Sequence, residues 1–337
     1  MKKILVTGAN GFVGSHILAA LQQHEVEVIA ACRNKNSLPE WFKGEVREGD
    51  LRDPAYIESA LQDIDTVCHA AAWTSLWRHE KQSQELYMKP SLALLDACVQ
   101  KGTSRFINIS TTSAAAPDGA HDAHSPGIIR PFWPHLTSVI TIENAMRQHA
   151  SAKITMINLR CGIFAGERYG LGIFPILLPR LKTHLVPWVA GGKTGLPIID
   201  GTDIGKAFAL ASINPALQGF ESFNIVGPAT PSLKQVITFL HTEYGYPLPH
   251  FSVPFPIAYA FAWLMEKLDN IVPWEPLITR SIIHLIEETG TNNESAKERL
   301  GYQPSVHWKD AIRKQLSEMH TRQEGNMRMY RPYPKMP

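Results

Sequence analysis

A glycine-rich segment near the start of the chain has the spacing that binds phosphate. Thr7–Gly14 reads T-G-A-N-G-F-V-G, after a short β-rich run and before apolar residues at helical spacing. Gly8 would permit a tight turn, Gly11 would let the backbone approach a pyrophosphate, and Gly14 would let the helix pack closely on the strand. The strand before this segment and the helix after it favour a dinucleotide site over a turn with no ligand.

The end of the next predicted strand indicates which dinucleotide is bound. Glu27–Ala31 is followed by C-R-N-K, with no carboxylate to bind the ribose hydroxyls of NAD. Arg33 offers a planar fork for a 2′-phosphate, and Lys35 offers a second cation. The alternative is that both are solvated loop charges. We expect NADP as the cofactor, with NAD as the second choice.

Further β-rich runs alternate with helical patterns along the first half of the chain, at 66–70, 106–110 and 154–159. This alternation predicts an α/β protein built on a Rossmann doubly wound parallel sheet, with a smaller C-terminal α/β substrate lobe. We expect a dinucleotide-binding Rossmann domain over 1–160. Residues 161–337 would form mainly the substrate-binding lobe, with some segments returning to the Rossmann sheet.

The pattern loosens after Arg160, where prolines and glycines interrupt short apolar runs. Helices are predicted near 204–213 and 233–244, and this part of the chain is interpreted as a second, smaller lobe that covers the substrate. The aromatic stretch Phe251–Met265 could wall an apolar pocket, and plain core packing explains it equally well.

Several segments together resemble one enzyme family. Beside the glycine turn, 49–53 (G-D-L-R-D), 69–72 (H-A-A-A) and 159–166 (L-R-C-G-I-F-A-G) are similar to its landmarks. The chain resembles the extended, atypical short-chain dehydrogenases/reductases of the NAD-dependent epimerase/dehydratase type, nearest the hydroxysteroid dehydrogenase and dihydroflavonol reductase branch. The implied cofactor contacts are Gly8, Asn10, Gly11, Phe12, Val13 and Gly14 in the turn, Asp50 and Leu51 at the adenine, and Ala70, Ala71 and Ala72 beside the ribose.

The catalytic pair of that family is missing. Its members use a Ser/Thr, a Tyr and a Lys four residues after the Tyr, and the resemblance places Thr112 at the Ser/Thr position. His135 stands where the family has Tyr, Val139 where it has Lys, and Tyr87 where it has Asn. We take Thr112 and His135 as the candidate catalytic residues, since an unperturbed imidazole titrates near neutrality. A packed, non-catalytic His135 is the competing interpretation.

Two functions follow from this pattern. The first is an atypical NADP-dependent oxidoreductase that acts on a small apolar alcohol or ketone. The second is a redox-inactive dinucleotide-binding protein, or an enzyme that uses the dinucleotide structurally for a non-redox step. The loss of the Tyr-Lys pair motivates the second hypothesis.

Composition excludes several other classes of protein. The 337 residues carry a formal net charge of +2, and no Lys/Arg run indicates nucleic-acid binding. No stretch reaches the roughly 18 apolar residues that a membrane span needs. We expect a cytoplasmic protein, and a homodimer is compatible with the sequence.

Metal binding is not expected. The 4 cysteines lack paired ligand spacing, which predicts free thiols in a reducing compartment. His121, Asp122 and His124 could suggest a metal site, but no further ligand follows at a recognisable spacing, which favours a solvated loop.

Overall fold

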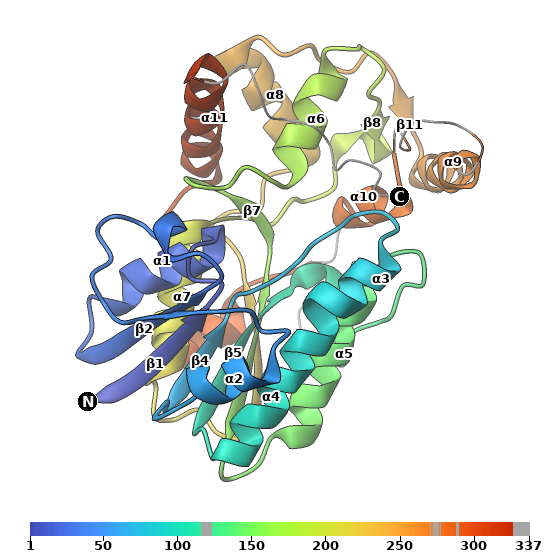
Figure 1. Ribbon diagram of the computed structural model, residues 1–337. Coiled ribbons are helices and arrows are strands. Elements are labelled where there is room, and N and C mark those ends of the chain that lie inside the picture. Colours follow the sequence, from blue (N-terminus) through green and yellow to red (C-terminus); the bar gives the residue numbers. More distant parts are fainter. Residues whose placement is uncertain (116–122, 270, 272–275, 277, 288–289, 326–337) are drawn as a thin grey trace.

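Seven parallel strands form the main sheet of the protein, as a computed structural model shows (Figure 1). The structure describes residues 1–115, 123–269, 271, 276, 278–287 and 290–325. The order of these strands across the sheet is β10-β6-β5-β4-β1-β2-β3. In chain order the strands are β1 (Lys2–Thr7), β2 (Val26–Cys32), β3 (Val46–Glu48), β4 (Thr66–His69), β5 (Arg105–Thr111), β6 (Thr155–Cys161) and β10 (Phe220–Ile225). Successive strands run outward from β1 to β3 and then restart on its other side at β4. This reversal opens a crevice at the carboxyl ends of β1 and β4, where parallel sheets bind ligands.

Helices cover both faces of the sheet. One face carries α1 (Phe12–Leu21) and α7 (Gly201–Ile213). The other face carries α2 (Pro54–Ala60), α4 (Lys89–Lys101) and α5 (Pro134–His149). Side chains alternate between the faces with the period of a strand. Ile4 and Val6 lie in the core beneath α1 and α7, whereas Leu5 lies in the core beneath α4 and α5. The predicted Rossmann doubly wound α/β fold is confirmed.

The smaller lobe lies over the carboxyl end of the sheet (Figure 1). It holds α6 (Ile173–Leu181), α8 (Leu233–Tyr244), α9 (Phe255–Leu268), α10 (Arg280–Leu285), α11 (Trp308–Gly325) and a short sheet of β8 (Trp188–Val189) and β11 (Ser252–Val253). A separate apolar core, which includes Leu178, Leu240 and Ile283, holds it together.

Two shorter strands and one short helix join the layers. β7 (Ile163–Ala165) pairs with β9 (Ile198–Asp200), and α3 (Glu80–Ser83) precedes α4. The helix predicted near 204–213 is α7, and it packs against α1 on the large sheet. Among the described residues, no helix combines the length and the apolar character that crossing a bilayer requires.

The aromatic stretch 251–265 packs only partly in the core, which Phe255 and Tyr259 contact from its edge. Ala258 and Ala262 are the residues of α9 that enter the core. Phe261, Trp263 and Leu264 are each almost half exposed. These large side chains therefore neither line the pocket described below nor fill the interior.

Candidate functional site

The glycine turn after β1 requires glycine for a different reason at each position. Gly8 has a φ of +62°, and a Cβ atom there would lie 2.7 Å from the Cα atom of Ala71. A Cβ atom on Gly14 would lie 2.2 Å from the Gly8 carbonyl oxygen. On Gly11 it would meet, among the described residues, only that same oxygen at 3.2 Å. The backbone at Gly11 is thus open on the side that a phosphate would approach, directly before the N-terminus of α1.

A buried hydrogen-bonded chain connects the ends of β1 and β4. Ser91 Oγ donates to the Tyr87 carbonyl at 2.6 Å, so it accepts from His69 Nε2 at 2.9 Å. His69 Nδ1 then accepts from Thr7 Oγ1 at 2.8 Å. Burial lowers the pKa of His69 to about 4, which keeps the ring neutral, as this chain requires.

This chain also sets the backbone that follows β4. The amides of Ala70 and Ala71 donate to Thr7 Oγ1, each at 3.3 Å. The segment 70–72 is therefore held against the glycine turn, where the family resemblance places the ribose. His69, the histidine of H-A-A-A, thus links the ends of β1 and β4 by hydrogen bonds.

The charged residues after β2 and β3 form the predicted adenine end of the site. Arg33 is exposed directly after β2, and its guanidinium has no hydrogen bond or ion pair among the described residues. Lys35 instead lies 3.9 Å from Glu48 in an exposed ion pair. Arg52 donates to both carboxylate oxygens of Asp50 and lowers the pKa of Asp50 to about 2, and the charge of Arg33 contributes.

Thr112 and His135 lie in different surroundings. Thr112 follows β5, is 6% exposed and lines a small pocket. His135 occupies the first turn of α5, does not line that pocket, and packs on the Tyr87 ring with 5.3 Å between centroids. Its Nδ1 atom is buried and has no hydrogen-bond partner among the described residues. Burial lowers the pKa of His135 to about 4, so the expectation of titration near neutrality was wrong.

The position of the family's lysine is apolar in this chain. Val139 is 3% exposed and belongs to the core beneath α4 and α5. It lies one helical turn after His135, where the family's lysine would point toward the cofactor.

A buried ion pair fixes α5 to the sheet. Sequence reasoning missed it. Arg160 Nη2 lies 2.7 Å from Glu143 Oε2, and both side chains are 1% exposed. Ser110 and Asn158 also donate to Glu143. An arginine within an apolar strand is the feature that could have indicated a buried partner.

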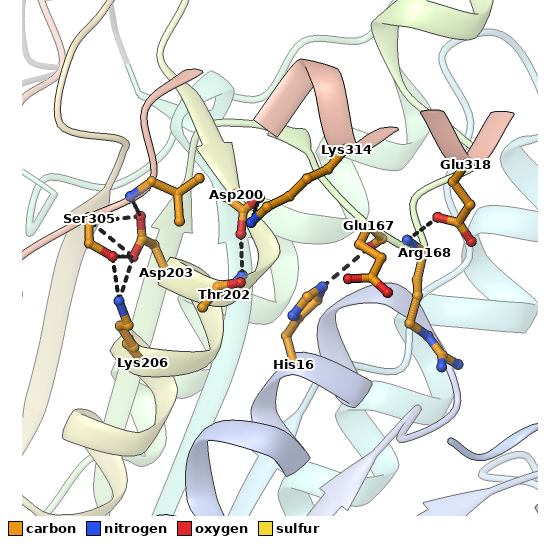
Figure 2. Close-up of polar contacts among 11 residues, drawn as sticks. His16, Glu167, Arg168, Asp200, Thr202, Asp203, Lys206, Ser305, Lys314 and Glu318 are labelled. Carbon is orange, nitrogen blue, oxygen red and sulfur yellow. Dashed lines mark hydrogen bonds and ion pairs between the residues drawn. The ribbon is translucent and has the colours of Figure 1, made fainter. Parts of the chain in front are cut away.

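A second set of polar contacts attaches the smaller lobe beside the glycine turn (Figure 2). Asp203 of α7 accepts from the amides of Ser305 and Val306 and from Lys206. Lys314 of α11 lies 3.3 Å from Asp200, which caps α7.

The same figure shows how α1 meets this lobe. The ring of His16 lies 3.3 Å from the Glu167 carbonyl oxygen. The amide of Arg168 donates to Glu318 of α11. The helix that begins at the phosphate turn is thus fixed directly to the segment leading into the smaller lobe.

The pocket beside Thr112 is formed by both lobes. The large sheet contributes Thr111 and Thr112 from the end of β5, Gly162 follows β6, and the smaller lobe contributes His284 and Glu287. Sequence reasoning missed the last two because no local pattern marks them.

The histidine and aspartate residues for which the sequence favoured a solvated loop over a metal site are only partly described. His121 and Asp122 lie outside the described residues, and His124 lies 3.7 Å from Glu221. All 4 cysteines are buried and free of disulfides. Burial raises the pKa of Cys161, which keeps that thiol protonated.

Comparisons with known proteins agree with this geometry. The model of the "NAD dependent epimerase/dehydratase family" matches residues 4–225. The "Putative dihydroflavonol 4-reductase" of Synechocystis sp. is 25% identical, over 90% of this chain and 93% of that protein. The sterol-4-alpha-carboxylate 3-dehydrogenase, decarboxylating, of Dictyostelium discoideum is 23% identical, over 93% and 99%.

Solved structures share the fold. The UDP-glucuronic acid 4-epimerase from Bacillus cereus, in complex with UDP-glucuronic acid and NAD, matches with a TM-score of 0.70 at 20% identity. The match covers 95% of this chain and 99% of that one.

Proposed function

Since the chain belongs to the NAD dependent epimerase/dehydratase family, we propose that it is an atypical NADP-dependent oxidoreductase acting on a small apolar alcohol or ketone. The resemblance to this type of extended short-chain dehydrogenase/reductase is confirmed. At the coarser level the chain is an oxidoreductase or epimerase of this family, and the proposal concerns its cofactor, its substrate and its catalytic residues.

One observation carries the proposal, namely the open backbone at Gly11. Backbone atoms occupy the space that a side chain would need at Gly8 and Gly14, whereas Gly11 leaves room beside the N-terminus of α1. Backbone amides and the positive end of the helix favour an anion at this place. A dinucleotide held there supplies or accepts a hydride, and residues of the chain bind it and place the substrate.

The preference for NADP rests on Arg33. No carboxylate follows β2 to bind ribose hydroxyls, and the exposed Arg33 guanidinium makes no hydrogen bond or ion pair among the described residues. A planar guanidinium can bind a 2′-phosphate with two hydrogen bonds. The matched epimerase from Bacillus cereus is in complex with NAD, so a preference for NADP would distinguish this chain from it.

The proposed apolar substrate fits the residues around Thr112. Ile163, Pro197 and Leu285 contribute apolar surface to the pocket. The two sequence relatives are named for a flavonol-type and a sterol-type substrate. We assign Thr112 a hydrogen bond to the substrate oxygen. His135, neutral at physiological pH and outside this pocket, would act on the site indirectly, through its packing on Tyr87 in the first turn of α5.

A redox-inactive role is the second candidate. The environment of Val139 and the neutral ring of His135 favour it, because neither residue supplies the charge that the family's Tyr-Lys pair uses. In that case the dinucleotide would bind without turning over.

The test combines a binding titration with nicotinamide absorbance. We expect NADPH to bind and to be oxidised in the presence of at least one apolar ketone from a panel that includes steroid and flavonoid carbonyls. Binding without absorbance change across the panel, and across matching alcohols with NADP⁺, would favour the redox-inactive role. Absence of binding would refute both.

A further inference from the structure

A histidine–carboxylate pair at the end of α10 reaches the pocket that Thr112 lines. His284 is 4% exposed, and its Nδ1 atom lies 2.8 Å from Glu287 Oε2. Its Nε2 atom lies 3.0 Å from the carbonyl oxygen of Ser113, the residue after Thr112. His284, Glu287 and Thr112 all line the same pocket. The smaller lobe thus brings an ionisable pair to the end of β5.

Both partners of the His284 ring can only accept hydrogen bonds. A backbone carbonyl carries no proton, and the hydrogen bond from His284 lowers the pKa of Glu287, which therefore stays ionised at neutral pH. Each ring nitrogen must then carry a proton. Two protonated nitrogens make the ring an imidazolium cation.

The charges around the ring favour this cation. Glu287 is in direct contact, and the charge of Arg130, before α5, acts on Glu287 more weakly. Arg280, on the same helix, lies over the ring of Phe132, 4.7 Å from its centroid. Phe132 and Trp133 pack edge-on against His284, at 6.3 and 6.2 Å between centroids. The carboxylate at contact distance therefore outweighs the more distant cations.

The family's catalytic position provides no proton donor of this kind here. His135 is neutral and Val139 is apolar, while Thr112 can relay a proton without supplying one. We propose that His284 is the catalytic acid for the substrate oxygen held at Thr112, and that Glu287 is its positioning residue. This inference rests on the proposed function and deepens it.

The proton transfer balances in both directions. In reduction, a hydride adds to the carbonyl carbon, and the π-electron pair moves to the oxygen. The Nε2 proton of His284 leaves its hydrogen bond with the Ser113 carbonyl and passes to the substrate oxygen, so an N–H bond breaks, an O–H bond forms, and the ring becomes neutral. Glu287 continues to accept from Nδ1, and solvent returns the proton to Nε2. In oxidation the neutral ring accepts the proton of the alcohol.

The first experiment needs no turnover. Nitrogen-15 NMR of histidine-labelled free protein at pH 7 should show His284 with both ring nitrogens protonated, the signals being assigned by their loss in His284→Gln. In Glu287→Gln the same ring should be neutral at pH 7. A neutral His284 ring in the unmodified protein would overturn the proposal.

The second experiment measures catalysis with NADPH and the ketone reduced fastest in the panel. His284→Gln should lower kcat by about 10²–10³-fold while NADPH affinity stays within about twofold. The matched control is His241→Gln, because His241 also bonds a carbonyl, that of Tyr246 at 2.8 Å, but lies on α8 away from the pocket. Its kcat should stay unchanged. A His284→Gln enzyme as active as this control would contradict the proposal.

Glu287→Gln separates a catalytic effect from a structural one. If Glu287 acts by keeping His284 charged, its loss should be partly rescued at low pH, and the deficit in kcat should shrink from pH 8 to pH 6. A deficit in kcat that is equal at every pH would refute the role of Glu287. This test does not depend on whether His284→Gln folds. An unmodified protein that binds NADPH but reduces no ketone would instead refute the proposed function, and this inference with it.

Discussion

A half-buried imidazole stands at the first turn of α5, where the resemblance places a phenol. The pKa of His135, at about 4, leaves its ring neutral from pH 5 to pH 8. The ring packs on Tyr87, and its Nδ1 atom has no hydrogen-bond partner among the described residues. His135 can therefore support the first turn of α5 in this range of pH without gaining or losing a charge.

Removing this ring should affect turnover but not the pH profile. We expect His135→Ala to lower kcat by about tenfold or more, with cofactor affinity within about twofold, because the ring is remote from the phosphate turn. The shape of the pH–rate profile between pH 5 and pH 8 should stay the same. A limb near neutrality that disappears in His135→Ala would show that the ring titrates there.

Arg33 provides the test of cofactor choice at the residue scale. Arg33→Ala should weaken NADP⁺ binding by about 1.5–3 kcal/mol through loss of a charged hydrogen bond, and leave NAD⁺ binding nearly unchanged. Lys35→Ala is the matched control, since Lys35 is already paired with Glu48, and its effect should stay below about 0.5 kcal/mol. Calorimetric titration measures both, and equal losses for the two cofactors would refute the assignment.

At the element scale, different glycines of the β1–turn–α1 unit serve helix packing and ligand binding. The same short segment holds one glycine that the fold needs and one that the ligand needs. Gly14 contacts the backbone of Gly8, whereas Gly11 faces open space apart from that one oxygen.

Two alanine substitutions should therefore differ. Gly14→Ala should destabilise the protein by about 2 kcal/mol or more, because its Cβ atom would lie 2.2 Å from the Gly8 carbonyl oxygen, which cannot easily move. Gly11→Ala should cost less than about 1 kcal/mol of unfolding free energy yet reduce dinucleotide affinity at least about tenfold. Urea unfolding and calorimetry give the two quantities, and the reverse order would contradict this division.

The sequence predicts these elements well because their causes are local. The continuous apolar run Ile4–Val6 specifies a strand that is buried on both faces, and the glycine spacing specifies the turn. The layer of α7 was not predictable in this way. An amphipathic helical pattern shows that one face is buried but does not identify the partner, which here is α1.

At the scale of the whole molecule, the two lobes form the pocket together. Thr112 comes from the large sheet and His284 from the smaller lobe, more than half of the chain apart in sequence. The polar contacts of Asp203, Asp200 and Arg168 fix the lobes to each other (Figure 2). The sequence could predict Thr112 through a family motif, but His284 becomes recognisable only when the fold brings it to Ser113.

The buried carboxylate of Asp203 should be the strongest of these attachments. It is 0% exposed, and its removal would leave the amides of Ser305 and Val306 without their acceptor. We expect Asp203→Ala to lower the unfolding free energy by about 3 kcal/mol. The exposed Asp310, paired with Arg313, is the control, and Asp310→Ala should cost less than about 0.5 kcal/mol. Similar costs for both variants in urea unfolding would contradict this role.

The measurement that tests the central claim most directly is calorimetric titration of the unmodified protein with NADPH and NADH. We predict that NADPH binds with a dissociation constant below about 0.1 mM and at least about tenfold more tightly than NADH, which corresponds to about 1.4 kcal/mol or more. The Gly11→Ala variant should show this binding strongly weakened. If neither cofactor binds at millimolar concentration, the glycine turn is not a dinucleotide site and the proposed function is wrong.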